Sequence, residues 1–344
     1  MTQTEIVVTE PTRFDRRSAP VPEPGPGEVV VAVERIGVCG TDIHAFFGRQ
    51  PFFSYPRILG HELAVRPLSW GPDCGPAPGC GTGDLCAVEP YLNAPGSPAS
   101  RRGKTNCCEA LQVLGVHCDG GMRSRIVVPA TKLHAAGGLS ADQVALTEML
   151  CIGRHAVDRA AITQDDYAVV IGGGPIGLSV LSFLRTATPQ AALVDRDVAR
   201  VAFAREILGN ERASAVSPGK DVESVLRTLG GGELPSVIFD ATGNAASMME
   251  CFHLAAHGGR IVFVGLFQGE IRFDDPNFHR RELTVLSSRN AVSADFSRVL
   301  ADLRSGAVTT TPWISHRMAL SEVPERFHTV VTDPTLRKAV IEVA

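Results

Sequence analysis

Side chains that bind metal ions occur in three short stretches of the sequence. Cys39 lies in GVCGTDIHAFFG, His61 and Glu62 lie in ILGHEL, and Glu148 lies in LTEMLCIGRHA. A thiolate, an imidazole and a carboxylate together suit an open zinc site, which keeps a position for water or substrate. The spacing alone does not establish such a site. A single cysteine is more often a small buried apolar residue, and a single histidine is more often a loop residue with a backbone partner.

A glycine-rich turn indicates dinucleotide chemistry. Gly172, Gly174 and Gly177 form G-x-G-x-x-G after the apolar run YAVVI and before IGLSVLSFLRTA, which has helical spacing. An acidic residue, Asp195, ends the next apolar run 18 residues after Gly177. Glycines at these positions let backbone amides approach a pyrophosphate, and the helix N-terminus adds positive potential. The alternative is a tight strand–helix turn that binds nothing.

The acid at the end of the second strand predicts which dinucleotide binds. Asp195 would accept hydrogen bonds from the adenosine ribose hydroxyls and would repel a 2′-phosphate, which favours NAD. Arg196 and Arg200 keep NADP open as the alternative, and Arg196 also belongs to the predicted cofactor site. Pro175 and Ile176, which open the helix, complete that site.

Two regions of the chain differ in their residue patterns, and these patterns predict the elements that position the candidate residues. Residues 1–145 are rich in Gly and Pro, with short apolar runs at 28–38 and 122–130, which is typical of a β-rich domain with long loops. From about residue 165, short apolar strands alternate with helices, which predicts a parallel sheet covered on both faces. The predicted strands are 167–174, 191–195, 236–243 and 260–266, and the predicted helices are 176–187, 199–208 and 245–256. The tail from about 285 predicts one helix, ADFSRVLADL, and one strand, KAVIEV.

Composition bounds the function classes. The chain has 344 residues, 44% hydrophobic and 20% charged, with a formal net charge of −4, so no basic surface argues for nucleic acid. No apolar stretch approaches the ~18 residues of a membrane span, and the N-terminus does not have the pattern of a signal peptide. Nine cysteines, an odd number, argue against a disulfide framework. We therefore expect a cytoplasmic protein with no nucleic-acid partner and no membrane partner.

The motifs together resemble one enzyme family. GVCGTDIH, GHE, TEMLCIGRHA and GGGPIG occur in the order and approximate spacing of the medium-chain dehydrogenase/reductase family, and they resemble its zinc-dependent alcohol and polyol branch. The resemblance implies an α/β protein in two domains. Residues 1–145 and 285–344 would form a GroES-like β-rich catalytic domain, and residues 146–284 a doubly wound Rossmann domain. It also implies a homodimer or a homotetramer.

The resemblance assigns roles to the metal-binding residues. Cys39 and His61 match the two firm zinc ligands, and either Glu62 or Glu148 would add a carboxylate, with water completing the site. Asp42 matches the carboxylate that orients the zinc-binding histidine.

Three further positions take roles from the resemblance. Thr41 and His44 match a proton relay, and Arg289, in SSRNA, resembles a residue that reaches the cofactor phosphates. If His44 had no such role, it would be an ordinary surface histidine.

The segment 94–108, here called the lobe, departs from the family pattern. Relatives often carry a structural zinc on C-x2-C-x2-C-x7-C, and the four corresponding positions here are Ala94, Ser97, Ser100 and Cys108. One sulfur cannot make the closed four-ligand site of a structural zinc. We therefore expect one zinc per chain, at the catalytic site.

Four other cysteines are possible ligands for a structural zinc in the same lobe. The sequence predicts that Cys107 is a packing residue. Cys74, Cys80 and Cys86 would have to rescue a structural site, but their spacings match no usual zinc pattern, and Cys86 lies in an apparent strand.

The family resemblance also implies the reaction. It implies a small-molecule substrate and reversible oxidation of a secondary alcohol, with zinc as Lewis acid, a proton path through Thr41 and His44, and hydride transfer to the nicotinamide. EPYLNA, LQVLGVH and FHRRELTVLSSRNA look most like polyol and sugar-acid members, such as hexonate dehydrogenases.

A sugar acid would need a cation for its carboxylate and walls for its pocket. Candidate cations and walls, each of which has an ordinary surface or core role as the alternative, are Arg49, Arg57, Arg123, Phe46, Phe47 and Phe53.

Two other functions remain open at this point. The first is a zinc-free quinone or enoyl reductase of the same superfamily, although such enzymes do not have the Cys39 and His61 pair. The second is a binding or structural protein that keeps the fold and the nucleotide pocket without turnover. The intact ligand set argues against the second.

Overall fold

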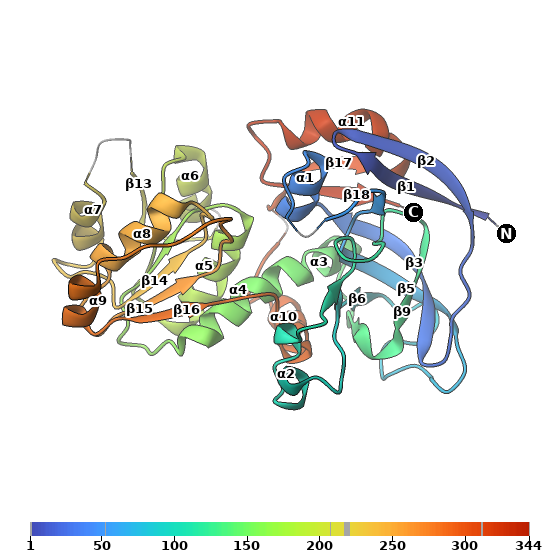
Figure 1. Ribbon diagram of the computed structural model, residues 1–344, viewed down its shortest axis with the longest axis horizontal. Coiled ribbons are helices and arrows are strands. Elements are labelled where there is room, and N and C mark those ends of the chain that lie inside the picture. Colours follow the sequence, from blue (N-terminus) through green and yellow to red (C-terminus); the bar gives the residue numbers. More distant parts are fainter. Residues whose placement is uncertain (1, 52, 207, 217–220, 311, 344) are drawn as a thin grey trace. The chain divides into compact units, whose positions relative to one another are not determined.

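The chain forms two compact units in a computed structural model that describes residues 2–51, 53–206, 208–216, 221–310 and 312–343. One unit runs up to Met149 and resumes at Ala291, and the other comprises Leu150–Asn290. These divisions lie a few residues beyond those that the sequence suggested at 145 and 284. Figure 1 shows the second unit as an insertion between the two segments of the first.

A seven-stranded sheet is the centre of the first unit. Its order is β10-β6-β5-β3-β18-β17, with β9 also paired to β3. The strands are β3 (Glu28–Gly37), β5 (Glu62–Trp70), β6 (Cys86–Val88), β9 (Arg125–Pro129), β10 (Leu133–Ala135), β17 (Ile314–Ala319) and β18 (Lys338–Glu342). In Figure 1, β18 from the end of the chain lies beside β3 from its beginning.

The register of this sheet brings distant parts of the sequence together. Gly37 at the end of β3 is opposite Glu62 on β5 and opposite Val340 on β18. The turn that follows β3 therefore lies beside the first residue of β5. Lys338, two residues before Val340, reaches the same place.

Smaller elements surround the sheet. A three-stranded sheet has the order β2-β1-β4, and β7 pairs with β8. Their bounds are β1 (Thr2–Glu10), β2 (Arg13–Pro20), β4 (Arg57–Ile58), β7 (Tyr91–Leu92) and β8 (Gln112–Val113). The helices are α1 (Gly40–Phe46), α2 (Pro98–Arg101), α3 (Ala141–Ala145), α10 (Ser293–Ser305) and α11 (Val323–Val331), with 3-10 turns at Thr105–Cys107, Ala130–Lys132 and Leu320–Glu322. The tail thus contains β17 and α11 besides the predicted helix and strand.

The second unit is built on a six-stranded sheet in which every pairing is parallel. Its order is β13-β12-β11-β14-β15-β16. Successive strands are added towards one edge of the sheet from β11 to β13 and towards the other edge from β14 to β16. Doubly wound folds bind ligands at this switch between β11 and β14. The strands are β11 (Ala168–Ile171), β12 (Ala191–Asp195), β13 (Ala213–Ala215), β14 (Val237–Asp240), β15 (Arg260–Phe263) and β16 (Thr284–Ser287). The helices are α4 (Thr147–Ala160), which begins in the first unit, α5 (Pro175–Ala187), α6 (Val198–Glu206), α7 (Val222–Leu229), α8 (Ala245–Leu254) and α9 (Asp275–Arg281).

The parallel sheet forms because its strands are short apolar runs suited to burial on both faces. β11 and β14 are almost wholly buried, as in other parallel sheets covered by helices. The predicted parallel sheet is therefore confirmed, while the short strands β13 and β16 and the helices α7 and α9 were not predicted.

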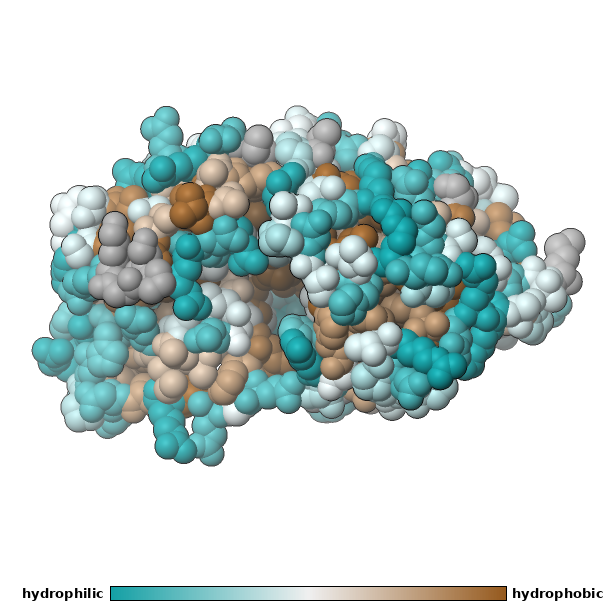
Figure 2. All heavy atoms as spheres, turned by 90° about the horizontal axis from the view of Figure 1, so that it is seen from above, coloured by the Kyte–Doolittle hydropathy of each residue, from teal (hydrophilic) through white to brown (hydrophobic). Residues whose placement is uncertain are grey.

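On the face that Figure 2 shows, polar side chains surround several groups of apolar ones. Large apolar side chains that remain exposed are Leu68, Val198, Leu266, Phe273 and Val285. In the described part of the chain, no helix has the length and apolar character needed to cross a membrane.

Candidate metal centre and dinucleotide site

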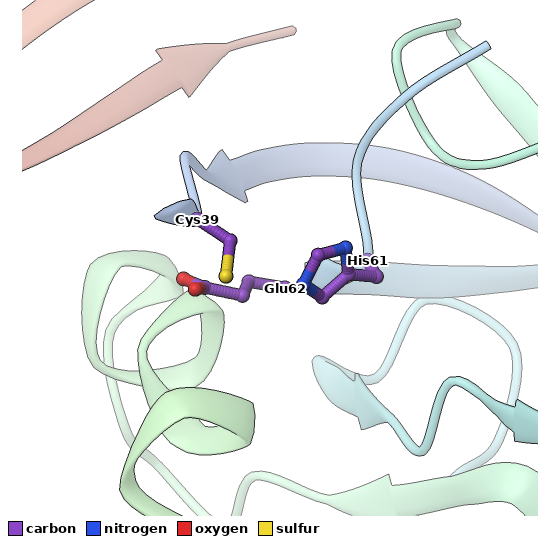
Figure 3. Close-up of side chains that lie close together, drawn as sticks. All are labelled: Cys39, His61 and Glu62. Atoms are coloured by element: carbon purple, nitrogen blue, oxygen red, sulfur yellow. The ribbon is translucent and has the colours of Figure 1, made fainter. Parts of the chain in front are cut away.

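Three of the predicted metal ligands come together in the first unit. The ligand atoms of Cys39, His61 and Glu62 all lie within 4.8 Å of one another, and Figure 3 shows the three side chains side by side. Cys39 caps the N-terminus of α1, directly after β3, while His61 and Glu62 lead into β5. The pairing of β3 with β5 therefore builds the group from two stretches of the sequence. It is the one such group found within the described ranges.

Asp42 connects the two stretches that supply these ligands. Its carboxylate is 1% exposed and accepts hydrogen bonds from the backbone N–H of Cys39 (2.9 Å) and of Gly60 (3.2 Å). The same carboxylate lies 3.8 Å from Nδ1 of His61. Burial raises the pKa of Asp42, although the nearby His61 opposes the rise. The position suits the predicted orientation of the histidine ring.

The electrostatics of the group favour a cation. Burial by itself lowers the pKa of His61, but the Cys39 thiol and the Asp42 and Glu148 carboxyls raise it, and the net pKa is well above the ordinary value. Among the residues that the structure describes, Nδ1 of His61 is buried without a hydrogen-bond partner. Several acidic groups thus share a desolvated space, where uncompensated negative charge is costly. A divalent cation would offset that charge, and the donor set of thiolate, imidazole and carboxylate fits Zn²⁺.

Lys338 belongs to the same group, and the sequence analysis missed it. Its ammonium lies 2.6 Å from Oε1 and 2.5 Å from Oε2 of Glu62, and Lys338 is 3% exposed. Burial lowers the pKa of Lys338, but Glu62 and Cys39 raise it above its ordinary value. One signal was available, namely a lysine that opens the mostly apolar strand KAVIEV.

Glu148 lies near this group but is not one of the three residues within 4.8 Å. It is buried in the first turn of α4, and the hydroxyl of Tyr91 donates a hydrogen bond to its Oε1. Burial raises the pKa of Glu148, while the positive charge of His61 lowers it. The sequence analysis did not identify Tyr91 as a functional residue.

The two predicted relay residues lie on α1. Thr41 is partly buried and His44 is exposed, and they are one helical turn apart directly after Cys39. This order, from a half-buried hydroxyl to an exposed imidazole, suits a path for protons towards solvent.

The glycine-rich turn joins β11 to α5 in the second unit. Gly172 has a φ of +101°, which favours glycine, and a Cβ on Gly177 would lie 1.7 Å from the carbonyl oxygen of Gly172. Gly174 is the N-cap residue of α5, and Pro175 opens the helix in the position where proline fits best. Only glycine therefore fits at the points where the turn and the helix approach most closely.

Asp195 lies at the end of β12, beside this turn. It accepts hydrogen bonds from the backbone N–H of Gly173 (2.5 Å) and of Asp197 (2.7 Å). The guanidinium of Arg200 is 3.6 Å from Asp195 and 3.6 Å from Asp197, while Arg196 is exposed. Arg289 is exposed after β16, and Ile176 is partly buried in the first turn of α5.

The lobe with three missing cysteines is held by hydrogen bonds. The backbone N–H of Ala94 lies 3.3 Å from Sγ of Cys108, and Ser97 caps α2 by accepting from the N–H of Ser100. The hydroxyls of Ser97 and Ser100 are 3.0 Å apart, and Asn93 donates to Ser100. A hydrogen bond from Ser97 is the main cause that lowers the pKa of Cys108. The four positions thus lie together although one alone is a thiol.

The prediction for Cys107 is wrong. Cys107 is exposed, whereas Cys108 is buried, because the 3-10 turn Thr105–Cys107 directs the two neighbours in different directions. Cys80 and Cys86 pack in the core of the first unit, and the thiol of Cys74 donates to the carbonyl of Glu28. Within the described ranges none of these three joins a metal-binding group.

The candidate substrate residues have different surroundings. Arg57 pairs with Asp119, and Arg123 with Glu5, whereas Arg49 is exposed with its guanidinium 5.3 Å from the ring centre of Phe47.

The three candidate phenylalanines are packing residues to different degrees. Phe46 is 2% exposed and belongs to the core, where it packs against Phe14 and Phe327. Phe47 and Phe53 are partly buried against that core. Phe46 therefore does not line an open pocket.

Comparison with known proteins identifies the family. A model of the alcohol dehydrogenase GroES-like domain matches residues 25–137, and a model of zinc-binding dehydrogenases matches residues 175–305. The L-galactonate-5-dehydrogenase of Escherichia coli (strain K12) is 36% identical over 343 residues, which cover 99% of each chain. The 2-dehydro-3-deoxy-L-galactonate 5-dehydrogenase of Pseudoalteromonas atlantica is 28% identical over 324 residues, which cover 93% of this chain and 92% of that protein.

Solved structures agree with these relationships. The alcohol dehydrogenase rspB from E. coli CFT073, in complex with NADH, superposes with a TM-score of 0.92 at 27% identity, covering 99% of each chain. A protein from Sinorhizobium meliloti 1021 bound to NADP gives a TM-score of 0.89 at 26% identity, covering 100% of each chain. The chain therefore belongs to the zinc-dependent medium-chain dehydrogenase/reductase family and is an NAD(P)-dependent oxidoreductase that acts on CH–OH groups.

Proposed function

We propose that this enzyme oxidises a secondary hydroxyl group of a sugar acid, as a hexonate 5-dehydrogenase does, with NAD as hydride acceptor and one zinc ion per chain. The observation that carries the proposal is the group formed by Cys39, His61 and Glu62 within 4.8 Å. The relationship to an L-galactonate-5-dehydrogenase over the whole chain supports the substrate class.

The residues of the metal centre would have two kinds of role, to bind the metal ion and to hold its ligands in place. Cys39 and His61, with a carboxylate from Glu62 or Glu148, would hold the zinc ion, which when bound supplies a Lewis acid for the substrate hydroxyl. Asp42 would keep the loop of Cys39 and the ring of His61 in place, since it contacts both stretches.

The proton released in the oxidation needs a path to water. The hydroxyl of Thr41 would accept it at the buried end and pass it to the imidazole of His44, which is exposed to solvent. Both groups lie on α1, whose N-cap is the ligand Cys39, so one short helix would connect the metal centre with bulk water.

The second unit would bind and orient the nicotinamide cofactor. The amides of the turn Gly172–Gly177, with Pro175 and Ile176 at the start of α5, would face the pyrophosphate. Asp195 would bind the adenosine ribose, Arg196 would flank it, and Arg289 would reach the phosphates. When bound, the nicotinamide would accept the hydride from the substrate carbon, and the protein would position the two for this transfer.

Assembly and location are part of the proposal. β16 is an edge strand with mostly exposed residues, and Val285 on it is 38% exposed, so a second copy of the chain could extend the sheet there. We propose a homodimer or homotetramer. A zinc-binding thiol among nine free cysteines suits the reducing cytoplasm.

The proposed activity is tested with NAD and a panel of aldonates and polyols, followed by NADH absorbance. We expect the highest kcat/KM with an aldonate that carries a secondary hydroxyl at the carbon before its terminal CH₂OH group. Turnover of polyols alone would change the substrate class. Zinc and NAD binding without any turnover would favour a nucleotide-binding protein that keeps the fold, and metal-independent reduction of a quinone would favour a reductase.

We expect NAD to be preferred over NADP. A 2′-phosphate beside the Asp195 carboxylate would cost on the order of a few kcal/mol in a partly desolvated site, and roughly tenfold in kcat/KM for each ~1.4 kcal/mol. The measurement is kcat/KM for both cofactors in the wild type, in Asp195→Ser and in the neighbouring control Asp197→Ser. The preference should weaken only in Asp195→Ser, and equal values in the wild type would mean that Arg196 or Arg200 accommodates the phosphate.

We also expect one zinc ion per chain. Ala94, Ser97 and Ser100 occupy three of the four structural-zinc positions, and neither a methyl group nor a neutral hydroxyl replaces a zinc-bound thiolate. Plasma mass spectrometry after dialysis should give the same single zinc in the wild type and in Cys108→Ser. Two zinc ions in the wild type and one in the variant would show that the lobe does bind metal.

A further inference from the structure

A buried hydroxyl contacts a carboxylate of the metal centre. Tyr91 is 2% exposed on the short strand β7, and its hydroxyl donates a hydrogen bond to Oε1 of Glu148. Glu148 is itself buried. A buried carboxylate needs hydrogen-bond donors, and each donor also fixes the direction in which the carboxylate points.

The surroundings of Tyr91 hold its ring in one place. The ring packs edge-on against Phe296 of α10, with ring centres 6.3 Å apart at 69°. Phe296 in turn stacks on His134, with ring centres 4.9 Å apart at 16°.

A polar network anchors that stack. Nε2 of His134 lies 3.4 Å from the buried carboxylate of Glu89, which also accepts from Lys132 and from the hydroxyl of Ser293. Lys132 donates a further hydrogen bond of 3.0 Å to Asn93, two residues after Tyr91. Three segments of the first unit, 89–93, 132–134 and 293–296, therefore fix the position of the Tyr91 ring, and through it the position of its hydroxyl.

The two carboxylates of the metal centre, Glu62 and Glu148, have different partners. Lys338 contacts both oxygens of Glu62 with a full positive charge. Tyr91 contacts Glu148 through a neutral hydroxyl, at one oxygen. Glu62 thus has a charged partner at both oxygens, whereas Glu148 has a second oxygen that Tyr91 does not contact.

We propose that Tyr91 is a positioning residue of the metal centre, which holds Glu148 in a single orientation so that its second oxygen can serve the bound cation. The proposal rests on the proposed function, because it takes Glu148 to be part of the metal centre. It adds a residue and a division of roles: Glu62 pairs with Lys338, and Glu148 is oriented by Tyr91.

The test removes one hydroxyl and keeps the ring. Tyr91→Phe is compared with Tyr167→Phe in the second unit, where the hydroxyl of Tyr167 is also buried and donates to the carbonyl of Leu226 at 2.7 Å. Zinc affinity is measured by competition with a chelator, and the absorption spectrum of the Co²⁺-substituted protein reports the ligand geometry. We expect a roughly 10–100-fold weaker zinc affinity and a changed cobalt spectrum for Tyr91→Phe, as is typical for partners of metal ligands. Tyr167→Phe should match the wild type in both.

A double-mutant cycle with Glu148→Gln separates the inference from the proposed function. If Tyr91 acts through Glu148, Tyr91→Phe should have no further effect on zinc affinity once Glu148→Gln is present. Independent, additive losses, or a wild-type affinity and cobalt spectrum in Tyr91→Phe, would overturn the inference while leaving the proposed function in place. Unchanged zinc affinity and turnover in Glu148→Gln would instead remove Glu148 from the metal centre, and the inference would fail together with that part of the proposed function.

Discussion

Replacing Cys39 with serine is expected to abolish turnover and zinc binding while the fold survives. A neutral hydroxyl is a poor replacement for a thiolate, and the thiol of Cys39 is one of three ligand groups within 4.8 Å. Loss of a residue that merely supports a metal ligand costs roughly 10–100-fold in affinity or activity, so loss of a ligand itself should cost at least that. The fold should survive because Cys39 is the N-cap residue of α1, a position that serine favours.

The matched control is Cys118→Ser. Both thiols are half-buried in the first unit, but Cys118 points at the carbonyl of Val113, at 3.8 Å, and belongs to no metal-binding group within the described ranges. Circular dichroism, zinc content and turnover are measured on both variants. Near wild-type turnover in Cys39→Ser would remove Cys39 from the site, and an equal loss in Cys118→Ser would point to general damage by the substitution.

The family and the enzyme class were predictable from local motifs, and the comparisons confirm both. The glycine-rich turn is local, because Gly172, Gly174 and Gly177 act within one strand–helix connection whose geometry admits no Cβ at Gly177. The parallel sheet was predictable for a similar reason, since its strands are short apolar runs separated by helices. Such features depend on residues that are neighbours in the sequence.

The residues that the sequence analysis missed depend on pairing between distant segments. Lys338 reaches Glu62, 276 positions away, because β18 pairs with β3 in a register that puts Val340 opposite Gly37. Tyr91 reaches Glu148, 57 positions away, from a strand of two residues. No periodicity within either stretch reports these contacts, because they are set by tertiary structure.

Weak local patterns explain the other errors. β17 is half-buried without regular alternation, so its sequence ISHRMA does not read as a strand. The exposure of Cys107 is set by a single 3-10 turn, which the adjacent pair of cysteines did not reveal.

Replacing Lys338 with methionine is expected to destabilise the metal-free protein by about 3–5 kcal/mol, the cost of leaving a buried charge without its partner. Methionine keeps much of the lysine side-chain volume, so the loss of stability reports the missing ammonium group. In the wild type that ammonium lies 2.5 Å and 2.6 Å from the two carboxylate oxygens of Glu62. Denaturant unfolding with and without a chelator measures the effect. Zinc should restore part of the stability, because a divalent cation also offsets the charge of Glu62.

The double variant Lys338→Met with Glu62→Gln decides whether the ion pair is the cause. Removal of both charges leaves no buried unpaired ion, so the double variant should be more stable than Lys338→Met alone. If the two losses simply add, then Lys338 stabilises the protein through packing at the start of β18, and Glu62 is not neutralised by it. Recovery in the double variant, together with a zinc effect confined to proteins that keep Glu62, would show that Lys338 and the metal ion offset the same buried carboxylate.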